Sequence, residues 1–490
     1  MKRRSWLNLC LCLLLAIFNW NSLLLSQERF RKTPPYPESL AELKLPEVDS
    51  ASLSNGLALY LIHRDNVPII NLRLIVFAGE SSSPEKLPGV ATLTAKMINL
   101  GALDLSSAEI DERIEFMGGN FTSSVYDDYS VFDFNFLEEH LDDAIGLLSR
   151  MILFPAFKKL EIENMKRSMK YELLNKKSDP EFLARRQIHR LLFKGHPYEK
   201  SIYNEDVIIN LTQRDLAAFY DKYYKPNNSI VFLAGNLNLP TASRIVSRHF
   251  STWQRKEVNH PFLPPPKASD RKRICVVNLP RAKDATIYMG NVLSMPGASG
   301  ELLPLFVLNQ VLGGTTASRL FMNLRESKGY AYWAFSEIEI FKNFCIFLIK
   351  TKVLAEVTYK SIEEAFNELK SVTDGEISSF EIEQAKSYLI GNFPLQIEAL
   401  PSLSFKVSES RIFNLEDELW SKYYEKIMLV NSQQVFETAR KYLLLTPVVV
   451  IVGDPKNIID YITEFEEIEF YDNRGILQQT IKKEKSSEDR

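Results

Sequence analysis

The sequence predicts an α+β protein made of two similar halves, each a mostly antiparallel sheet with helices packed on one face. A helix, a turn, an apolar strand and a glycine follow one another from Leu211 to Gly235, and the same order recurs from Val430 to Gly453. The strand-ending glycines Gly79 and Gly297 are separated by the same number of residues, 218, as the glycines that end this repeat. Between the halves, residues 256–272 are rich in proline and predict a stiff linker. The repeat therefore predicts two homologous halves of roughly 200 residues each.

Composition and charge are those of ordinary globular proteins. The chain has 490 residues, 45% of them hydrophobic and 25% charged, which suffices for large cores. The formal net charge is -3 and the basic residues are scattered, so no nucleic-acid-binding surface is predicted. The one basic run, Lys482–Lys485 with a glutamate inside it, is typical of a solvated chain end.

The N-terminus has the pattern of an export signal. Met1–Arg4 carries positive charge, and Trp6–Phe18 is almost entirely apolar. This run is shorter than the roughly 20 residues that span a membrane, which favours a signal peptide over residues 1–27 and an exported, periplasmic protein. Because no clean Ala-x-Ala site follows, an uncleaved membrane anchor is the alternative. Cys10 and Cys12 lack the small residues of a lipobox, which argues against a lipoprotein.

These patterns predict the order of domains along the chain. The segments are a signal peptide or anchor (1–27), an extended proline-rich leader (28–47), an N-terminal domain (48–255), the linker (256–272), a C-terminal domain (273–470) and a polar tail (471–490).

The first half begins with strands and continues with helices and a hairpin. The Asn55-Gly56 pair predicts a tight turn between two strands, and a third strand ends at Ala78. A buried helix is predicted from Gly89, and an amphipathic helix from Ser107 to Met117 with Ser106 or Ser107 as its N-cap. The elements predicted next are a hairpin over 120–136 that turns at Asp127-Asp128, helices over 158–176 and 181–192, a helix from Thr212 to Tyr224, a strand over 229–234 and a helix that ends at Trp253.

Two sets of residues invite a metal or redox interpretation, and both have a simpler one. Acidic residues surround His140 between Glu138 and Asp143, but acidic residues favour the first turn of a helix, and the apolar residues that follow form a buried stripe. Cys275 and Cys345 lie in strand-like runs of the second half. We interpret them as buried free thiols, with a disulfide as the alternative in an oxidising compartment.

The stretch from Ile69 to Ile98 carries the main functional signal. A strand, a loop rich in Gly, Ser and Pro, and a helix with Val90, Leu93 and Met97 at helical spacing follow one another. In this order the chain resembles the insulinase/pitrilysin family of zinc peptidases, in its mitochondrial-processing-peptidase-like branch. The resemblance extends from about Leu53 to Glu464 and implies the duplicated LuxS/processing-peptidase-like metallohydrolase fold.

The family carries an inverted zinc motif, H-x-x-E-H, on this helix. The matching positions here are Thr92-Leu93-Thr94-Ala95-Lys96, so both histidines and the catalytic glutamate are missing. The family's third zinc ligand, a glutamate, is matched by Glu172. A catalytic zinc needs about three protein ligands and a water, so a degenerate site of Thr92, Ala95 and Lys96 with Glu172 retained is not a zinc site. No metal is therefore expected on this chain.

The resemblance continues in the stretch from Leu312 to Tyr332. This stretch predicts a helix end, a Gly-Gly loop without the lysine of a phosphate-binding loop, a short helix from Ser318 and Gly329 as the C-cap before a strand. The family places an arginine and a tyrosine, seven residues apart, so that they reach toward the active site, and the matches here are Arg325 and Tyr332. A guanidinium can hold a peptide carbonyl, and a phenol can donate to a developing oxyanion. A helix-capping arginine and a half-buried strand tyrosine are the simpler interpretation, but the surrounding motif favours the functional one.

The resemblance therefore implies the zinc-less subunit of a heterodimeric metallopeptidase, inactive alone. The partner, an insulinase-family subunit with an intact H-x-x-E-H motif, would hold the zinc, and Arg325 and Tyr332 would act on the peptide substrate in trans. The family binds extended peptide at a sheet edge, which Asn120, Phe121 and Thr122 match. The alternative is a purely structural or scaffolding homologue in which the Arg/Tyr pair has no function. The sequence identifies neither the peptide substrate nor the partner.

The missing zinc also predicts a specific contact. Lys96 takes the place of the second zinc-binding histidine, and a buried carboxylate without a partner is costly. We therefore expect Lys96 and Glu172 to form an ion pair where zinc would sit, with their charged ends within about 6 Å of each other.

Overall fold

The computed structural model describes residues 45–482, except 66, 261, 268–271, 298, 417, 444–446 and 464. The expected signal peptide or anchor, nearly all of the leader and the last eight residues of the polar tail lie outside the described residues. Within the described part of the chain, no helix is long and apolar enough to cross a membrane.

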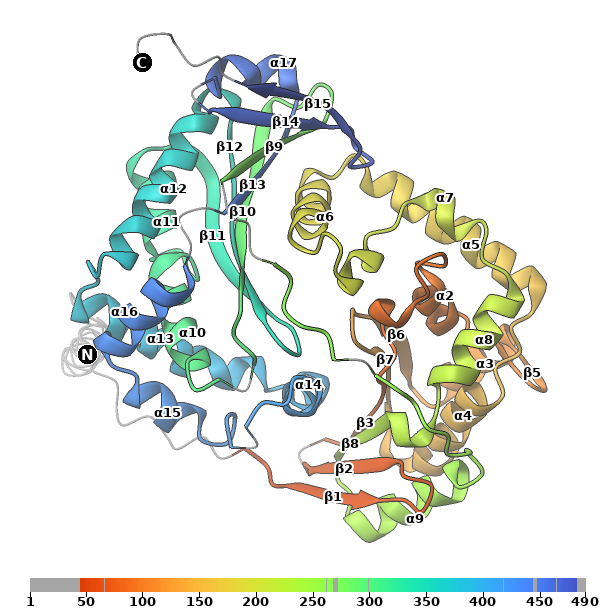
Figure 1. Ribbon diagram of the computed structural model, residues 1–490. Helices are drawn as coiled ribbons and strands as arrows, with labels where there is room; N and C mark the ends of the chain where they lie inside the picture. Colours follow the sequence, from red (N-terminus) through yellow and green to blue (C-terminus); the bar gives the residue numbers. More distant parts are fainter. Residues whose placement is uncertain are drawn as a thin grey trace, which may run out of the picture. The chain divides into compact units, whose positions relative to one another are not determined.

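The first half contains, among its described residues, a six-stranded sheet with the order β1-β2-β8-β3-β7-β6 (Figure 1). Its strands are β1 (Val48–Ser52), β2 (Ala58–His63), β3 (Ile69–Val76), β6 (Asn120–Val125), β7 (Ser130–Leu137) and β8 (Ser229–Gly235). The β2–β8 pair is parallel and the other neighbouring pairs are antiparallel. The predicted Asn55-Gly56 turn joins β1 to β2, with Gly56 at a φ of 89°. Strands β4 (Gly101–Ala102) and β5 (Leu105–Ser106) lie between β3 and β6 in the sequence and form a separate two-stranded sheet.

The second half contains a seven-stranded sheet, again among the described residues, with the order β11-β12-β10-β13-β9-β14-β15. Its strands are β9 (Arg273–Asn278), β10 (Asp284–Leu293), β11 (Ala331–Ile340), β12 (Cys345–Leu354), β13 (Val448–Gly453), β14 (Glu467–Tyr471) and β15 (Leu477–Lys482). The β13–β9 and β14–β9 pairs are parallel and the rest are antiparallel. Both sheets are therefore mostly antiparallel, which confirms the predicted fold class.

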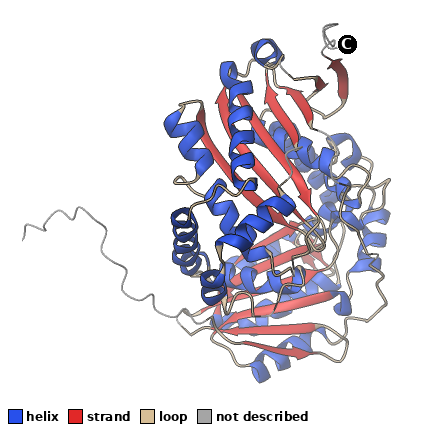
Figure 2. Ribbon diagram, turned by 60° about the vertical axis from the view of Figure 1, so that its left-hand side comes forward, coloured by secondary structure: helices blue, strands red, loops and turns tan. Residues whose placement is uncertain are grey.

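Helices and strands follow one another in a similar order in both halves, and Figure 2 shows the helices (blue) beside the strands (red). The first half has α2 (Val90–Lys96), α3 (Ser107–Phe116), α4 (Leu141–Leu153), α5 (Lys159–Lys176), α6 (Pro180–Leu192), α7 (Glu205–Ile208), α8 (Gln213–Tyr223) and α9 (Leu239–Phe250). The second half has α10 (Leu302–Leu312), α11 (Arg319–Phe321), a π-helical turn (Met322–Ser327), α12 (Thr358–Thr373), α13 (Ser379–Gln396), α14 (Leu400–Ile412), α15 (Tyr423–Leu429), α16 (Ser432–Tyr442) and α17 (Pro455–Ile458). Short 3-10 turns occupy Glu80–Ser82, Glu138–His140, Pro197–Ser201, Pro226–Asn228, Ala355–Val357 and Ile459–Tyr461.

Side-chain capping fixes the starts of several of these helices. The hydroxyl of Ser106 accepts from the amide of Glu109, whose carboxylate accepts from the amide of Ser106, and Thr212 and Asp215 repeat this capping box. Ser106 is one of the two N-caps predicted for α3, and Thr212, where a helix was predicted to begin, is the N-cap of α8. Since a cap satisfies amides that the helix cannot satisfy itself, these boundaries are local properties of the sequence.

The core of the first half lies between its sheet and its own helices. Alternate residues of β3, Ile70, Leu72, Leu74 and Val76, face α2, α4, α8 and α9 in one apolar cluster. The strand period of two sends Ile75 to the opposite face. Helices α2, α4, α8 and α9 therefore cover one face of this sheet, as predicted.

The opposite face of each sheet is covered by a helix from the other half. Helix α14 of the second half packs on β3 and β8, with Ile412 in a cluster with Ile75, Val131 and Phe232. Helix α6 of the first half packs on β10 and β13, and its residue Ile188 is fully buried there. This exchange of helices between the two halves was not predicted, because the sequence pattern of a helix does not show which of the two sheets it will cover.

Several smaller expectations are also decided by the structure. Cys275 and Cys345 are free and buried, as we interpreted them, and form no disulfide. The acidic run around His140 is a 3-10 turn that leads into α4, whose stripe includes the buried Ile145 and Leu148. Where a polar tail was expected, residues 477–482 instead form β15, an edge strand with every residue exposed.

Candidate functional site

Helix α2 is the helix that the resemblance matches to the family's zinc-binding helix, and its first turn is held by a buried carboxylate. Glu80 accepts hydrogen bonds from the amides of Gly89 at 3.1 Å and Thr92 at 2.8 Å, from the Ser83 hydroxyl at 2.8 Å, and from the Thr92 hydroxyl. Burial raises the pKa of Glu80 even though these four hydrogen bonds lower it. Thr92, at the position of the first zinc histidine, is thus committed to an internal contact.

The glycine before Glu80 allows this arrangement. A Cβ atom on Gly79 would lie 2.3 Å from the carbonyl oxygens of Tyr126 and Asp127, so only glycine permits the loop to reach the β6–β7 turn. The amides of Glu80 and Ser81 then donate to those two carbonyls. Sequence reasoning missed Glu80; the available signal was an acidic residue placed between a strand-ending glycine and the next helix start.

The predicted ion pair is present. Lys96 Nζ lies 3.9 Å from Glu172 Oε2, inside the expected range. The closer partner of Glu172 is Lys176, whose Nζ lies 2.7 Å from Oε1. The hydrogen bond from Lys176 is also the main reason that the pKa of Glu172 is lowered. The assumption of burial was wrong, since the side chains of Lys96 and Glu172 are 35% and 48% exposed.

The remaining changed position of the zinc motif, Ala95, offers no metal ligand. Ala95 is buried and has no donor atom. Among the described residues, no group of three or more His, Cys, Asp or Glu side chains could hold a metal ion. Glu172 is therefore a single carboxylate with two lysine neighbours, which is a poor environment for a divalent cation.

Arg325 lies in a helix that departs from α-helical geometry. The predicted short helix from Ser318 is α11 followed by the π-helical turn Met322–Ser327. In this turn the amide of Lys328 donates to the carbonyl of Asn323, five residues earlier. Arg325 is exposed and donates to the carbonyl of Ala331 at 3.1 Å. The predicted C-cap glycine, Gly329, has a φ of 65° and turns the chain into β11.

Tyr332 lies at a β-bulge. The register of β11 against β12 shifts between Ala331 and Trp333, so Tyr332 is the extra residue of the edge strand. Its ring is 48% exposed, its hydroxyl donates to Asp284 Oδ1 at 3.3 Å, and the Lys352 ammonium lies 5.5 Å from the ring centroid. A bulge redirects a side chain, so this phenol points away from the regular pattern of its strand.

The predicted substrate strand is a free sheet edge. Strand β6 lies at the end of the first sheet and pairs only with β7 among the described strands. Asn120 and Thr122 are exposed, whereas Phe121 packs against the rings of Phe132 and Phe134. Such an edge has unpaired backbone groups that can accept an added strand.

The structure keeps the two parts of the site in separate contact networks. Thr92, Lys96 and Glu172 make their described hydrogen bonds and ion pairs within the first half. Arg325 and Tyr332 make theirs within the second half. No hydrogen bond or ion pair among these described side chains joins the two sets.

Comparison with known proteins relates much of the chain to peptidase family M16. Residues 59–206 match the family model of the insulinases, peptidase family M16, and residues 210–389 match the model described as the peptidase M16 inactive domain. The chain is 25% identical over 348 residues to the non-peptidase homolog YmxG of Helicobacter pylori, covering 70% of this chain and 79% of that protein. It is 21% identical over 393 residues to the uncharacterized zinc protease YmxG of Bacillus subtilis, covering 79% and 93%.

Solved structures share the fold. A peptidase M16 inactive domain from Pseudomonas fluorescens superposes with a TM-score of 0.78 at 21% identity, over 83% of this chain and 98% of that one. The periplasmic protease PqqL of Escherichia coli gives a TM-score of 0.70 at 15% identity. The match covers 86% of this chain but 49% of PqqL, so this chain corresponds to about half of that protein.

Proposed function

Because the chain belongs to the insulinase family, peptidase family M16, and lacks its zinc motif, we propose that it is the non-catalytic subunit of a two-chain metallopeptidase. In this proposal an insulinase-family partner with an intact H-x-x-E-H motif holds the zinc. This chain contributes Arg325 and Tyr332 to the partner's site, and peptides are the substrate.

The observation that carries the proposal is the difference between the two halves. In the first half, the first zinc position has become a partner of Glu80, and Lys96 occupies the second. In the second half, Arg325 and Tyr332 remain exposed, one on a π-helical turn and the other at a β-bulge. Such irregularities are frequent at functional sites, where they redirect a side chain.

The chemistry assigned to each residue follows from its donors. Arg325 has a planar guanidinium that makes one described hydrogen bond, so it retains donors for a peptide carbonyl or a terminal carboxylate. The Tyr332 phenol can exchange its 3.3 Å contact with Asp284 for a hydrogen bond to the oxyanion that forms during hydrolysis. The zinc that activates the attacking water belongs to the partner.

Substrate is expected to bind as an added strand. The free edge of β6, with Asn120, Phe121 and Thr122, supplies backbone donors and acceptors for an extended peptide. A two-subunit assembly is further supported by PqqL, a single protease chain about half of which corresponds to this chain. PqqL is described as periplasmic, and the apolar segment Trp6–Phe18 supports export of this chain as well.

The experiment compares zinc content and peptidase activity of this chain, of an insulinase-family partner with the intact motif, and of their mixture. We expect activity that requires the mixture and falls about 100-fold or more with Tyr332→Phe, as on loss of an oxyanion donor. Tyr388→Phe is the matched control, because Tyr388 is 47% exposed and Tyr332 48%.

Stoichiometric zinc and activity in this chain alone would refute the proposal. An inactive mixture whose subunits form a stable complex would instead support the scaffolding alternative, in which Arg325 and Tyr332 serve only their local contacts with Ala331 and Asp284.

A further inference from the structure

The segment that carries Arg325 and Tyr332 is held by polar contacts to two neighbouring helices. It runs from Arg319 through the π-helical turn and Gly329 to the bulge in β11. Its apolar side chains Leu320 and Leu324 are fully buried, which fixes one side of the turn. Apolar packing has little directional preference, so the orientation of the opposite side requires directional contacts.

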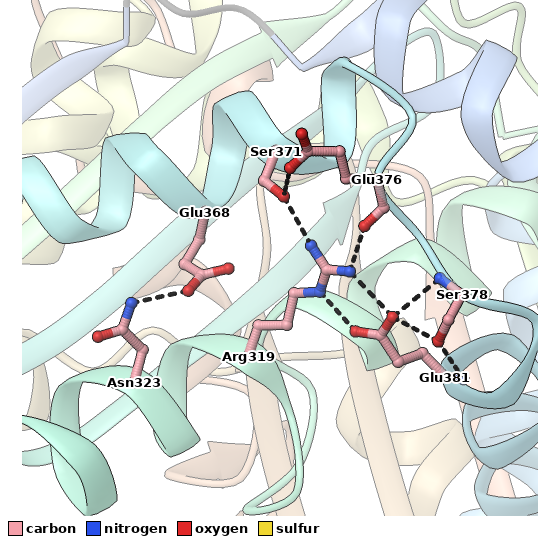
Figure 3. A network of polar contacts seen from close by, with 7 residues as sticks. All are labelled: Arg319, Asn323, Glu368, Ser371, Glu376, Ser378 and Glu381. Atoms are coloured by element: carbon pink, nitrogen blue, oxygen red, sulfur yellow. Dashed lines mark hydrogen bonds and ion pairs between the residues drawn. The ribbon is translucent and has the colours of Figure 1, made fainter.

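Arg319 makes the largest set of these contacts (Figure 3). Its Nε donates to Glu381 Oε1 at 2.6 Å and its Nη2 to Glu381 Oε2 at 2.9 Å, a bidentate ion pair. Its Nη1 donates to the Ser371 hydroxyl at 3.0 Å, and Nη2 also donates to the carbonyl of Glu376. One guanidinium thus joins α11 to the end of α12, to the loop that follows and to the start of α13.

Glu381 is also held by Ser378, at the start of its own helix. Its carboxylate accepts from the Ser378 amide at 2.9 Å and the Ser378 hydroxyl at 2.8 Å, which is the capping box of α13. Burial would raise the pKa of Glu381, but the hydrogen bonds from Arg319 and Ser378 outweigh it and hold that pKa at about 2. The carboxylate is therefore charged at any physiological pH.

A second contact lies one helical turn further along. Asn323 Nδ2 donates to Glu364 Oε2 at 3.0 Å and to Glu368 Oε1 at 2.7 Å, both on α12 (Figure 3 shows the Glu368 contact). Lys328 Nζ lies 3.2 Å from Glu364 Oε1. Arg319, Asn323 and Lys328 therefore hold the segment on the side toward α12 and α13, and Arg325 is left exposed.

We propose that Arg319 is a positioning residue for the Arg325–Tyr332 pair: its bidentate contact with Glu381 sets the direction in which the pair is presented to the partner's zinc site. This inference rests on the proposed function. Arg319 touches neither substrate nor zinc, and acts by orienting the π-helical turn from which the chain enters the bulge. Lysine cannot reproduce this bidentate contact, because its compact ammonium lacks the two parallel N–H donors of a guanidinium.

The test uses the active mixture described above and a double-mutant cycle. Arg319→Gln should lower kcat about ten- to hundredfold, as small misplacements of a catalytic group do, with the zinc content and partner affinity of the isolated complex unchanged. Arg319→Lys should restore part of that loss. In a background that carries both Arg325→Gln and Tyr332→Phe, Arg319→Gln should cause little further loss, because it acts through that pair.

Two further variants sharpen the comparison. Glu381→Gln keeps the capping box, in which glutamine replaces glutamate well, but removes the charge that Arg319 contacts, so it should resemble Arg319→Gln. Glu383→Gln on the same helix is the control, since Glu383 pairs with Lys386 at 3.0 Å. A kcat for Arg319→Gln equal to that of the Glu383 control, or a loss fully additive with the combined Arg325→Gln and Tyr332→Phe substitutions, would overturn the inference.

A measurement on the isolated chain separates this inference from the proposed function. Hydrogen exchange should be faster in Arg319→Gln for the amides of Lys328 and Tyr330, which donate to Asn323 and Leu324, and unchanged in the Glu383 control. If the wild-type mixture is inactive, the proposed function fails and the exchange result still decides whether Arg319 holds the segment. Unchanged exchange in Arg319→Gln would refute that role.

Discussion

Asp127, in the turn between β6 and β7, should make the protein less stable as the pH rises. One of its carboxylate oxygens, Oδ1, is buried without a hydrogen-bond partner. Burial raises its pKa from 3.8 to about 7, more than Ser201 and His189 lower it, and the charges of Asp128 and Glu339 raise it further. Replacing Asp127 with asparagine keeps the shape and removes the charge.

The sign and size of the effect follow from the two pKa values. The unfolded chain releases the Asp127 proton near 3.8, whereas the folded protein holds it to about 7. The folded state therefore binds more protons in this interval, and the free energy of unfolding falls as the pH rises from about 4 to about 7. With about 1.4 kcal/mol for each unit, the loss is at most about 4 kcal/mol. Asp127→Asn should match the wild type near pH 4 and exceed its stability at pH 8.

Urea unfolding between about pH 4 and pH 8 measures this difference directly. Asp142→Asn is the control, because hydrogen bonding by His249 and the charge of Arg248 lower the pKa of Asp142, and this side chain is 50% exposed. A lowered pKa contributes stability above the unfolded value, so this variant should be slightly less stable at neutral pH. Parallel pH profiles for Asp127→Asn and the wild type would refute the reasoning.

Three further predictions concern the degenerate zinc site. The combined substitutions Thr92→His, Ala95→Glu and Lys96→His should create stoichiometric zinc binding with Glu172, because Lys96 and Glu172 already converge to 3.9 Å; metal analysis showing no bound zinc would contradict this. Glu80→Ala should lower the free energy of unfolding by about 3 kcal/mol, since buried amides at the start of α2 lose their acceptor; urea unfolding with a smaller change than 1 kcal/mol would argue against it. Lys96→Met should change stability by no more than about 0.5 kcal/mol in the same assay, as expected for an exposed ion pair.

The parts of the fold that were predictable from the sequence depend on neighbouring residues. Helix α5 was expected over 158–176 and spans Lys159–Lys176, because an apolar spacing of 3.6 residues is a local pattern. Strand β14 was not predicted, because it has only five residues and is fixed by pairing in parallel with β9, which lies almost 200 residues earlier. Its assignment depends on a distant partner that a local pattern does not reveal.

The candidate site likewise has features that the sequence predicted and features that depend on contacts between distant residues. The positions of Thr92, Lys96, Arg325 and Tyr332 came from the resemblance to the insulinase family, and the Lys96–Glu172 contact followed from that resemblance together with their opposite charges. Glu80 could not be found in this way, because its role depends on a loop that approaches the β6–β7 turn within a distance only glycine allows. The sequence also did not show that Glu172 is about half exposed, because its burial depends on how α5 packs against its neighbours.

The geometry of the two halves bears on whether Arg325 and Tyr332 are functional or remain by descent. Regular helices and strands need no special support, whereas a π-helical turn is rare and both this turn and a bulge depend on the contacts around them. At the lost zinc site the helix is regular, and Glu80 satisfies its first turn. The Arg325 segment is instead irregular at both Arg325 and Tyr332 and is held by a bidentate ion pair from Arg319. Irregular geometry that depends on such added contacts is expected where side chains must be aimed, which supports the proposed role in presenting the pair to a partner.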